Sequence, residues 1–298
     1  MSESLLSVGL DVGTTSTQMV VSRLKVENRA SVFAVPELAI TQREILYESP
    51  VYFTPLLDES HVNGEKIREI VEEEYRKAGI SRAQVDTGAI IITGETSRKE
   101  NARAVLDALS DLAGEFVVAT AGPDLESILA AKGAGAVGYS EETGKTVLHM
   151  DIGGGTSNLA LIQDGKIRKT GCLNVGGRLV KLSDTGEITY VSPVLQGLFS
   201  GKAGKKITQE EASALADTLT RALEMAAGLR EPTALLDQLL TKETGEVWQP
   251  PEKPDVLSFS GGVADCIEKA HPWLEFGDIG PILGQSIRKS RLCQGQYQ

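Results

Sequence analysis

Residues 148–158 read LHMDIGGGTSN, and residues 6–16 read LSVGLDVGTTS. Each stretch is an apolar run that ends in one aspartate and a small-residue turn, and a second apolar run follows each turn. Two apolar runs on either side of a tight turn predict a β-hairpin. Because the same hairpin opens each half of the chain, we expect an internal duplication at the scale of a domain.

The length and charge of the chain fit a folded protein with two lobes. Its 298 residues exceed the roughly 250 residues beyond which single cores tend to split. The formal net charge of -11 argues against broad surfaces for nucleic acid or anionic membranes. No apolar run approaches the roughly 18 residues of a membrane span, and the first residues lack the basic region of a signal peptide. We therefore expect a cytosolic protein that binds neither nucleic acid nor membrane.

The cysteines and histidines show no spacing that is typical of a metal site. The three cysteines are odd in number and scattered, which predicts reduced thiols and no structural zinc. These six residues are Cys172, Cys266, Cys293, His61, His149 and His271.

Strands and helices are expected to alternate, which predicts an α/β fold. In the first half we expect strands at 88–93 and 115–120, and helices at 64–78, 102–113 and 125–132. Asn63 is expected to cap the first of these helices, and Gly79 is expected to end it. In the second half we expect strands at 146–152, 158–162 and 255–260, and a long helix after the capping box of Thr208 and Glu211. The lobes are then residues 1–145 and 146–298.

Gly133, Gly135 and Gly138 match the G-x-G-x-x-G pattern of dinucleotide sites. That fingerprint must follow a strand and open a helix. In the expected order of elements the stretch follows a helix and leads into a strand. We interpret these glycines as small residues that let a helix end pack closely.

The repeated turns are candidate phosphate-binding sites. A tight turn of Gly, Ser and Thr presents several backbone N–H groups in one direction, and these form a concave site for phosphate oxygens. Small side chains are needed there because a larger substituent on Cβ would hold the phosphate away. The candidate residues are Gly13, Thr14 and Thr15 in the first turn and Gly153, Gly154, Gly155 and Thr156 in the second.

Asp11 and Asp151 precede these turns and would repel a phosphate. Their presence is explained by a Mg²⁺ ion that keeps several waters, which the two carboxylates hold. We expect the two hairpins to bind one ATP molecule from both sides. Gly261 and Gly262 end a third apolar run and would offer a flat surface for adenine and ribose.

These motifs resemble those of the actin, Hsp70 and sugar-kinase ATPase superfamily. DVGTTS at 11–16 resembles the first phosphate loop, DIGGGTS at 151–157 the second, and FSGGV at 259–263 the adenosine motif. The stretches 123–138 and 277–290 are similar to the two helices that cross between lobes. The resemblance implies a two-lobed actin-like (ribonuclease H-like) ATPase fold built from a duplicated βββαβα unit.

Two longer stretches resemble a narrower family. FVVATAGPDLESILAAKGAGA at 116–136 and HMDIGGGTSN at 149–158 are similar to the ethanolamine ammonia-lyase reactivating factors of bacterial ethanolamine utilisation. The resemblance implies a chaperone-like ATPase that uses ATP and Mg²⁺ to exchange damaged cobalamin for intact coenzyme in its client, ethanolamine ammonia-lyase. It also implies a cytoplasmic location, with homo-oligomers and association with a bacterial microcompartment as further expectations. Members continue well past the adenosine motif, so we expect a further region to be missing here.

The resemblance also suggests catalytic roles. Asp11 and Asp151 would hold the waters of the metal ion, and Asp151 would help to orient the attacking water. A further carboxylate often lies near the first crossing helix in this superfamily, which makes Asp124 and Glu126 candidates; capping that helix is the alternative for Asp124. Two other functions are compatible with the fold: a small-molecule kinase and an actin-like assembly scaffold.

Overall fold

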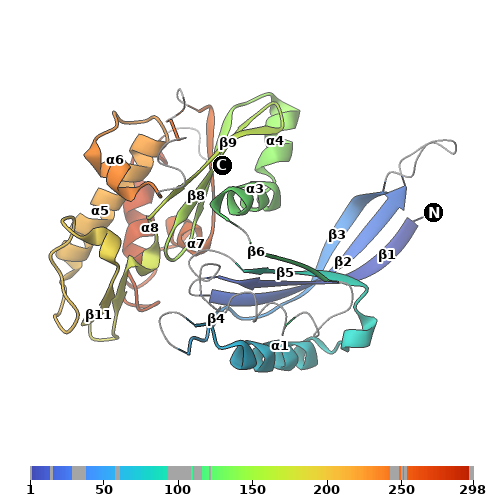
Figure 1. The fold of residues 1–298 in the computed structure, drawn as a ribbon. Coiled ribbons are helices and arrows are strands. Elements are labelled where there is room, and N and C mark those ends of the chain that lie inside the picture. Colours follow the sequence, from blue (N-terminus) through green and yellow to red (C-terminus); the bar gives the residue numbers. More distant parts are fainter. Residues whose placement is uncertain are drawn as a thin grey trace. The chain divides into compact units, whose positions relative to one another are not determined.

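The computed structural model describes residues 2–13, 16–28, 38–57, 61–92, 109, 116–120, 122–241, 248–249, 251 and 254–294. The chain divides into two compact units, Met1–Gly122 and Pro123–Gln298 (Figure 1).

The first unit is built on a six-stranded mixed sheet with the order β3-β2-β1-β5-β6, and β4 also pairs with β2. β1, β2 and β3 are antiparallel neighbours, whereas β5 runs parallel to β1 and β6 runs parallel to β5. The elements are β1 (Ser2–Val12), β2 (Ser16–Asn28), β3 (Leu38–Glu48), β4 (Tyr52–Phe53), α1 (Gly64–Ala78), the 3-10 turn η1 (Arg82–Gln84), β5 (Thr87–Ile92) and β6 (Phe116–Thr120).

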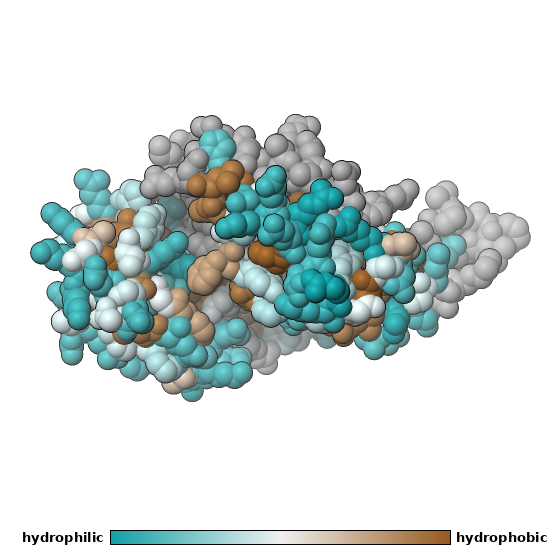
Figure 2. Space-filling model, turned by 90° about the horizontal axis from the view of Figure 1, so that it is seen from below, coloured by the Kyte–Doolittle hydropathy of each residue, from teal (hydrophilic) through white to brown (hydrophobic). Residues whose placement is uncertain are grey.

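Helix α1 covers one face of this sheet (Figure 1). Alternate residues of β1 and β5, such as Leu10 and Ile90, point to that face and form a core with Ile67 and Val71 of the helix. The predicted caps are confirmed. The N–H of Lys66 donates to Asn63 Oδ1, and the helix ends at Gly79 with φ of 69°. The side of the molecule seen in Figure 2 is mostly hydrophilic, with separate hydrophobic residues among polar ones.

The second unit repeats the topology of the first. Its four-stranded sheet has the order β12-β7-β8-β9, with β7, β8 and β9 antiparallel and β12 parallel to β7. This is the same order and direction as β5-β1-β2-β3. The two hairpins also share their register, because Asp11 lies opposite Gln18 and Asp151 lies opposite Asn158. The predicted duplication is confirmed at the level of strand pairing.

Helices cover both faces of the second sheet (Figure 1). α3 and α4 pack on one face through small residues such as Ala131 and Ala136, and α5 to α8 form the main core on the other. The capping box of Thr208 and Glu211 is confirmed at the start of α5. The elements are α3 (Pro123–Gly133), α4 (Ala136–Thr143), β7 (Val147–Ile152), β8 (Ser157–Gln163), β9 (Lys166–Leu173), η3 (Gly177–Leu179), β10 (Val180–Leu182), β11 (Ile188–Val191), η4 (Pro193–Leu195), α5 (Gln209–Ala226), α6 (Ala234–Leu239), β12 (Val256–Ser260), α7 (Gly262–Glu268) and α8 (Gly280–Lys289).

The interpretation of the G-x-G-x-x-G stretch was wrong in its details. The stretch joins two helices, because α4 begins directly after Gly135, whose φ is 76°. A Cβ atom on Gly133, Gly135 or Gly138 would meet no described atom within 4 Å, so close packing does not explain these glycines. A left-handed turn explains Gly135. The stretch still does not follow a strand, so the argument against a dinucleotide site holds.

The boundary expected at residue 145 stays a prediction about the two lobes. In terms of compactness, α3 and α4 group with the second unit because they pack on β7, β8 and β9.

The helix expected at 102–113 lies outside the described residues except for Leu109, which is helical and buried. No disulfide joins the three cysteines, all of which lie among the described residues. Among the described helices, none has the length and apolar character needed to cross a membrane.

Candidate functional site

The turn between β7 and β8 presents backbone N–H groups that have no acceptor in the described part of the chain. Gly153 N–H closes the turn by donating to Thr156 O at 2.9 Å. The next three N–H groups, those of Gly154, Gly155 and Thr156, donate to no acceptor in the described part of the chain. All three residues are partly exposed. Adjacent N–H groups of this kind form an anion-binding site.

A second segment binds this turn through the turn's carbonyl groups. Gly177 N–H donates to Gly153 O at 3.1 Å, and Arg178 N–H donates to Gly154 O at 2.6 Å. A Cβ atom on Gly176 would lie 2.4 Å from Gly154 O, so only glycine allows this approach. Gly155 differs, because a Cβ atom there would meet no described atom within 4 Å. The fold therefore needs glycine at 176, whereas no described atom requires glycine at 155.

A chain of hydrogen bonds fixes the Asp151 carboxylate at the end of β7. Ser260 Oγ donates to Asp151 Oδ1 at 2.5 Å. His149 lies between two serines of the neighbouring strand β12, with Nε2 at 3.0 Å from Ser260 Oγ and Nδ1 at 3.1 Å from Ser258 Oγ. The parallel register of β12 and β7 places these residues on one face of the sheet.

The hydrogen bonds also assign the tautomer of the buried His149. Because the only proton of the Ser260 hydroxyl goes to Asp151, Ser260 must accept from His149 Nε2–H. His149 Nδ1 then accepts from the Ser258 hydroxyl. Burial lowers the pKa of His149, and the nearby Asp151 carboxylate raises it by less, so the ring is neutral at pH 7. Asp151 Oδ2 has no hydrogen bond to a described residue.

Glu126 of α3 reaches the same part of the sheet. Asn158 lies opposite Asp151 in β8 and donates from Nδ2 to Glu126 Oε2 at 2.7 Å. The Asn158 side chain is buried, and its Oδ1 atom has no hydrogen-bond partner in the part of the chain that is described. An unsatisfied buried oxygen is costly, so a water molecule or a ligand is expected to supply a donor or cation to it.

Asp124 makes a different contact. Its Oδ1 accepts a hydrogen bond of 2.6 Å from Thr170 Oγ1 of β9. Asp124 lies within the first turn of α3 and is exposed. The bond ties the start of α3 to strand β9, next to the bond from Ser127 Oγ to Gly171 O. The two predicted acids are therefore separated: Glu126 contacts the row of Asp151 and Asn158, and Asp124 contacts β9.

Gly261 and Gly262 follow β12 directly. Gly261 has φ of 87°, and a Cβ atom there would lie 2.5 Å from Ile152 O and 3.0 Å from Asp151 Oδ1. Gly262 begins α7, and a Cβ atom there would meet no described atom within 4 Å. The end of β12 therefore packs against the end of β7 with no side chain between them.

In the first unit, the hairpin repeats part of this arrangement. Asp11 is exposed at the end of β1, and Gly13 is buried with its carbonyl accepting from Thr54 Oγ1 at 2.7 Å. Gln18, opposite Asp11, donates to Glu48 Oε1 at 2.9 Å. Each unit thus pairs an aspartate with an amide side chain that a glutamate binds. Thr14 and Thr15 lie outside the described residues.

A buried ion pair holds the segment that supports the glycine turn. Arg178 Nε lies 3.2 Å from Asp278 Oδ2, and Gly280 N–H donates to Asp278 Oδ1 at 2.8 Å. Burial raises the pKa of Asp278, and Gly280 N–H and Arg178 oppose that rise. Asp278 was not predicted from the sequence as a site residue, and no role was expected for His149, Asn158 or Ser260. The one available signal was the two-residue spacing of His149 and Asp151, which places both side chains on the same face of a strand.

The chain has close relatives of known name. The family model for ethanolamine utilisation protein EutA matches residues 3–297. The chain is 39% identical over 300 residues to ethanolamine ammonia-lyase reactivase EutA of Salmonella typhimurium, covering 96% of this chain and 62% of that protein. It is also 39% identical over 298 residues to the Escherichia coli protein of the same name, covering 95% and 61%. The chain therefore spans about three fifths of the length of these curated relatives.

Solved structures resemble the fold at low sequence identity. A Ppx/GppA family member of Aquifex aeolicus superposes with a TM-score of 0.52 and 15% identity, covering 89% of this chain and 69% of that one. A second structure of the Aquifex aeolicus PPX-GPPA enzyme has a TM-score of 0.51 and 16% identity, with coverage of 89% and 70%. These likenesses, together with the duplicated strand order, confirm the predicted actin-like α/β fold. The match of the family model along nearly the whole chain shows that it belongs to the ethanolamine utilisation protein EutA family.

Proposed function

We propose that this chain acts as an ATP-dependent reactivase of ethanolamine ammonia-lyase, which releases damaged cobalamin so that intact coenzyme can bind. The observation that carries the nucleotide part is the row of N–H groups at Gly154, Gly155 and Thr156 beside the fixed carboxylate of Asp151. The names of the two curated relatives support the choice of client and do not favour a kinase or an assembly scaffold.

Phosphate oxygens of ATP are the proposed ligands of these N–H groups, which donate to no described acceptor. The groups lie on a turn that the 176–178 segment holds from behind, so they need little reordering when an anion binds. Gly155 and Gly262 leave open space in which phosphate and nucleoside groups can approach the backbone. Thr14 and Thr15 of the first hairpin are proposed to act in the same way, and binding of one nucleotide by both hairpins stays a prediction.

The residues present fit a hydrated Mg²⁺ ion. Asp151 Oδ2 and the orphaned Asn158 Oδ1 are acceptors for the ion's water ligands, and Asp11 is the corresponding carboxylate of the first unit. No group of three or more His, Cys, Asp or Glu side chains suited to a metal occurs among the described residues. When bound, the ion would neutralise charge on the phosphates.

Glu126 is the proposed acid that orients the attacking water. It lies beside Asn158, in the row that contains Asp151, whereas Asp124 is engaged with Thr170 on β9. A carboxylate can accept one proton of a water molecule and direct its lone pair toward the phosphorus. The Ser260 and His149 bonds would keep Asp151 in one orientation during this step.

ATP binding can drive the exchange of cobalamin only if the nucleotide prefers one conformation of the protein. A ligand shifts a conformational equilibrium by the difference in its affinity for the two states. We propose that the conformation that binds ATP is also the one that loosens the client. Hydrolysis then resets the protein and gives the cycle a direction.

Reactivation of a blocked client tests this function. Ethanolamine ammonia-lyase inactivated with cyanocobalamin would be incubated with the chain, ATP, Mg²⁺ and adenosylcobalamin, and ethanolamine deamination would be measured. We expect activity to return with the wild-type chain and to stay absent with Asp151→Asn.

Asp164→Asn is the matched control, because Asp164 lies in the turn between β8 and β9, where its φ of 49° suits asparagine. This control should restore activity like the wild type. Equal rescue by Asp151→Asn, or rescue without ATP, would refute the proposal.

A further inference from the structure

The second unit has an insertion that the duplicated fold does not require. In the first unit, residues 49–63 connect the third strand to its helix; in the second unit, residues 174–208 make the same connection. The longer connection forms η3, β10, β11 and η4 before α5 begins. Leu195 and Ile207 of this connection are buried in the core of the second unit, so the insertion is a fixed part of the fold.

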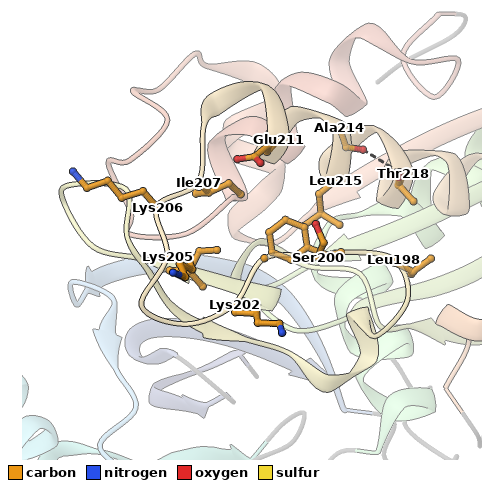
Figure 3. A pocket seen from close by; sticks show the side chains of 13 residues that line it. Leu198, Ser200, Lys202, Lys205, Lys206, Ile207, Glu211, Ala214, Leu215 and Thr218 are labelled. Carbon is orange, nitrogen blue, oxygen red and sulfur yellow. Dashed lines mark hydrogen bonds between the residues drawn. The ribbon is translucent and has the colours of Figure 1, made fainter.

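A pocket of about 530 Å³ lies between this insertion and α5 (Figure 3). Its walls include the apolar side chains of Ile188, Leu198, Phe199, Ile207 and Leu215. The backbone of the loop approaches the Phe199 ring so closely that a Cβ atom on Gly201 would lie 2.3 Å from it. This volume is large enough to hold a bulky apolar side chain.

Three lysines surround the pocket in a chain of net charge -11. Lys202, Lys205 and Lys206 are exposed, and none of their ammonium groups forms an ion pair with a described residue. The pocket's acid, Glu211, accepts the N–H of Thr208 in the capping box. The margin of the pocket therefore carries a net positive charge that attracts carboxylates.

We propose that this pocket binds an acidic peptide segment of a partner protein. One large apolar side chain of the segment enters the pocket, and the carboxylates that flank it in the peptide lie at the lysines of the margin. That the partner is the reactivated client rests on the proposed function, whereas the docking surface rests on the pocket alone.

The directions of the lysines favour a peptide over a small anion. Figure 3 shows Lys202 and Lys206 pointing their ammonium ends in different directions around the margin. A single phosphate or carboxylate needs charges that converge on one point. Charges spread along the margin match several carboxylates on an extended segment, and the apolar walls match the side chain between them.

Fluorescence anisotropy with a defined peptide tests the proposal. The probe is a labelled peptide of about ten residues with one central Phe flanked by Glu. We expect the wild-type chain to bind it and a triple variant, Lys202→Glu with Lys205→Glu and Lys206→Glu, to bind about tenfold more weakly, because three exposed ion pairs become repulsive. Raising the salt from about 0.05 M to about 0.5 M should weaken wild-type binding.

Two further variants distinguish binding in the pocket from attraction by the net charge of the whole chain. Ala214 is exposed on α5 and lines the pocket, so Ala214→Phe should fill it and weaken binding without changing the charge. The matched control reverses three exposed charges on β9, at Lys166, Arg168 and Lys169. It has the same net charge as the triple lysine variant and should bind the probe more tightly than that variant. Replacing the Phe of the probe by Ser should also weaken binding.

Several results would overturn the proposal. These are no binding of the probe by the wild-type chain, equal loss in the β9 control, or unchanged binding in the Ala214→Phe variant. Dissociation of a dimer by the triple lysine variant in sedimentation would show that a second copy covers the pocket instead. Nucleotide binding by the same samples would be measured separately. Its absence in the wild type would refute the proposed function and leave the docking surface standing.

Discussion

Gly155 lies in the turn that is proposed to bind phosphate, and Gly176 lies in the segment that holds this turn in place. Substitution by alanine is expected to affect ligand binding at Gly155 and stability at Gly176. Gly176→Ala places a Cβ atom 2.4 Å from Gly154 O and 2.8 Å from Gly153 O. Both carbonyls are held by hydrogen bonds from Gly177 and Arg178, so neither can move cheaply. Gly155→Ala places a Cβ atom where no described atom lies within 4 Å.

The structure sets the size of each effect. The clash at Gly176 is a case of overpacking and is expected to cost about 1–3 kcal/mol of stability. For a unit of this size the Tm should fall by roughly 2–12 °C. Gly155→Ala restricts the unfolded chain without a clash, so stability should stay the same or rise by up to about 1 kcal/mol. The new methyl group would hold phosphate away from the N–H groups, and ATP should bind at least about tenfold more weakly, or about 1.4 kcal/mol.

Thermal unfolding without nucleotide and calorimetric titration with ATP and Mg²⁺ measure the two properties separately. The expected pattern is a lowered Tm for Gly176→Ala, and an unchanged Tm with weakened ATP binding for Gly155→Ala. Wild-type affinity in Gly155→Ala would refute the assignment of this turn to phosphate. A wild-type Tm in Gly176→Ala would refute the close approach of the two segments.

The remaining predictions concern two hydroxyl groups and two acids. The Tyr75 hydroxyl is buried with no hydrogen-bond partner among the described residues, so Tyr75→Phe should raise the free energy of unfolding by about 1 kcal/mol in urea denaturation. Burial raises the pKa of Tyr75 to about 12 from 10.0, so the unfolded state loses its proton first and wild-type stability should fall as pH rises through this window. Ser260→Ala removes the donor to Asp151 and should weaken Mg²⁺-dependent ATP binding about tenfold in calorimetry. Glu126→Gln should lower the rate of phosphate release about a hundredfold with little change in ATP affinity, whereas Asp124→Asn should leave that rate unchanged.

Specific outcomes would contradict these three expectations. A loss of stability in Tyr75→Phe would show that the hydroxyl has a partner. The same alkaline loss in that variant as in the wild type would show that ionisation of Tyr75 does not cause the loss. Unchanged affinity in Ser260→Ala would mean that the orientation of Asp151 does not depend on this bond. A slowed release in Asp124→Asn with a normal rate in Glu126→Gln would exchange the roles of the two acids.

Elements that depend on neighbours in sequence could be predicted. The hairpins followed from apolar runs around glycine turns, α1 from its caps at Asn63 and Gly79, and α5 from the capping box of Thr208 and Glu211. Each of these signals acts within a few residues. The start of α4 was missed because the left-handed turn at Gly135 joins two helices, and a strand was expected there.

The network around Asp151 could not be predicted because it depends on strand register. Ser260 meets Asp151 only because β12 pairs in parallel with β7 across more than a hundred residues of chain. The position of His149 between two serines follows from the same pairing. Likewise, Glu126 was a candidate by resemblance, but its contact with Asn158 depends on how α3 packs on the sheet.

Calorimetric titration of the chain with a non-hydrolysable ATP analogue and Mg²⁺ tests the central claim most directly. The two aspartates at equivalent ends of β1 and β7 are expected to serve one nucleotide. We predict binding of a single nucleotide per chain that Asp11→Asn and Asp151→Asn each weaken strongly and that Asp164→Asn leaves unchanged. An absence of binding, or wild-type affinity in either of the first two variants, would contradict the account.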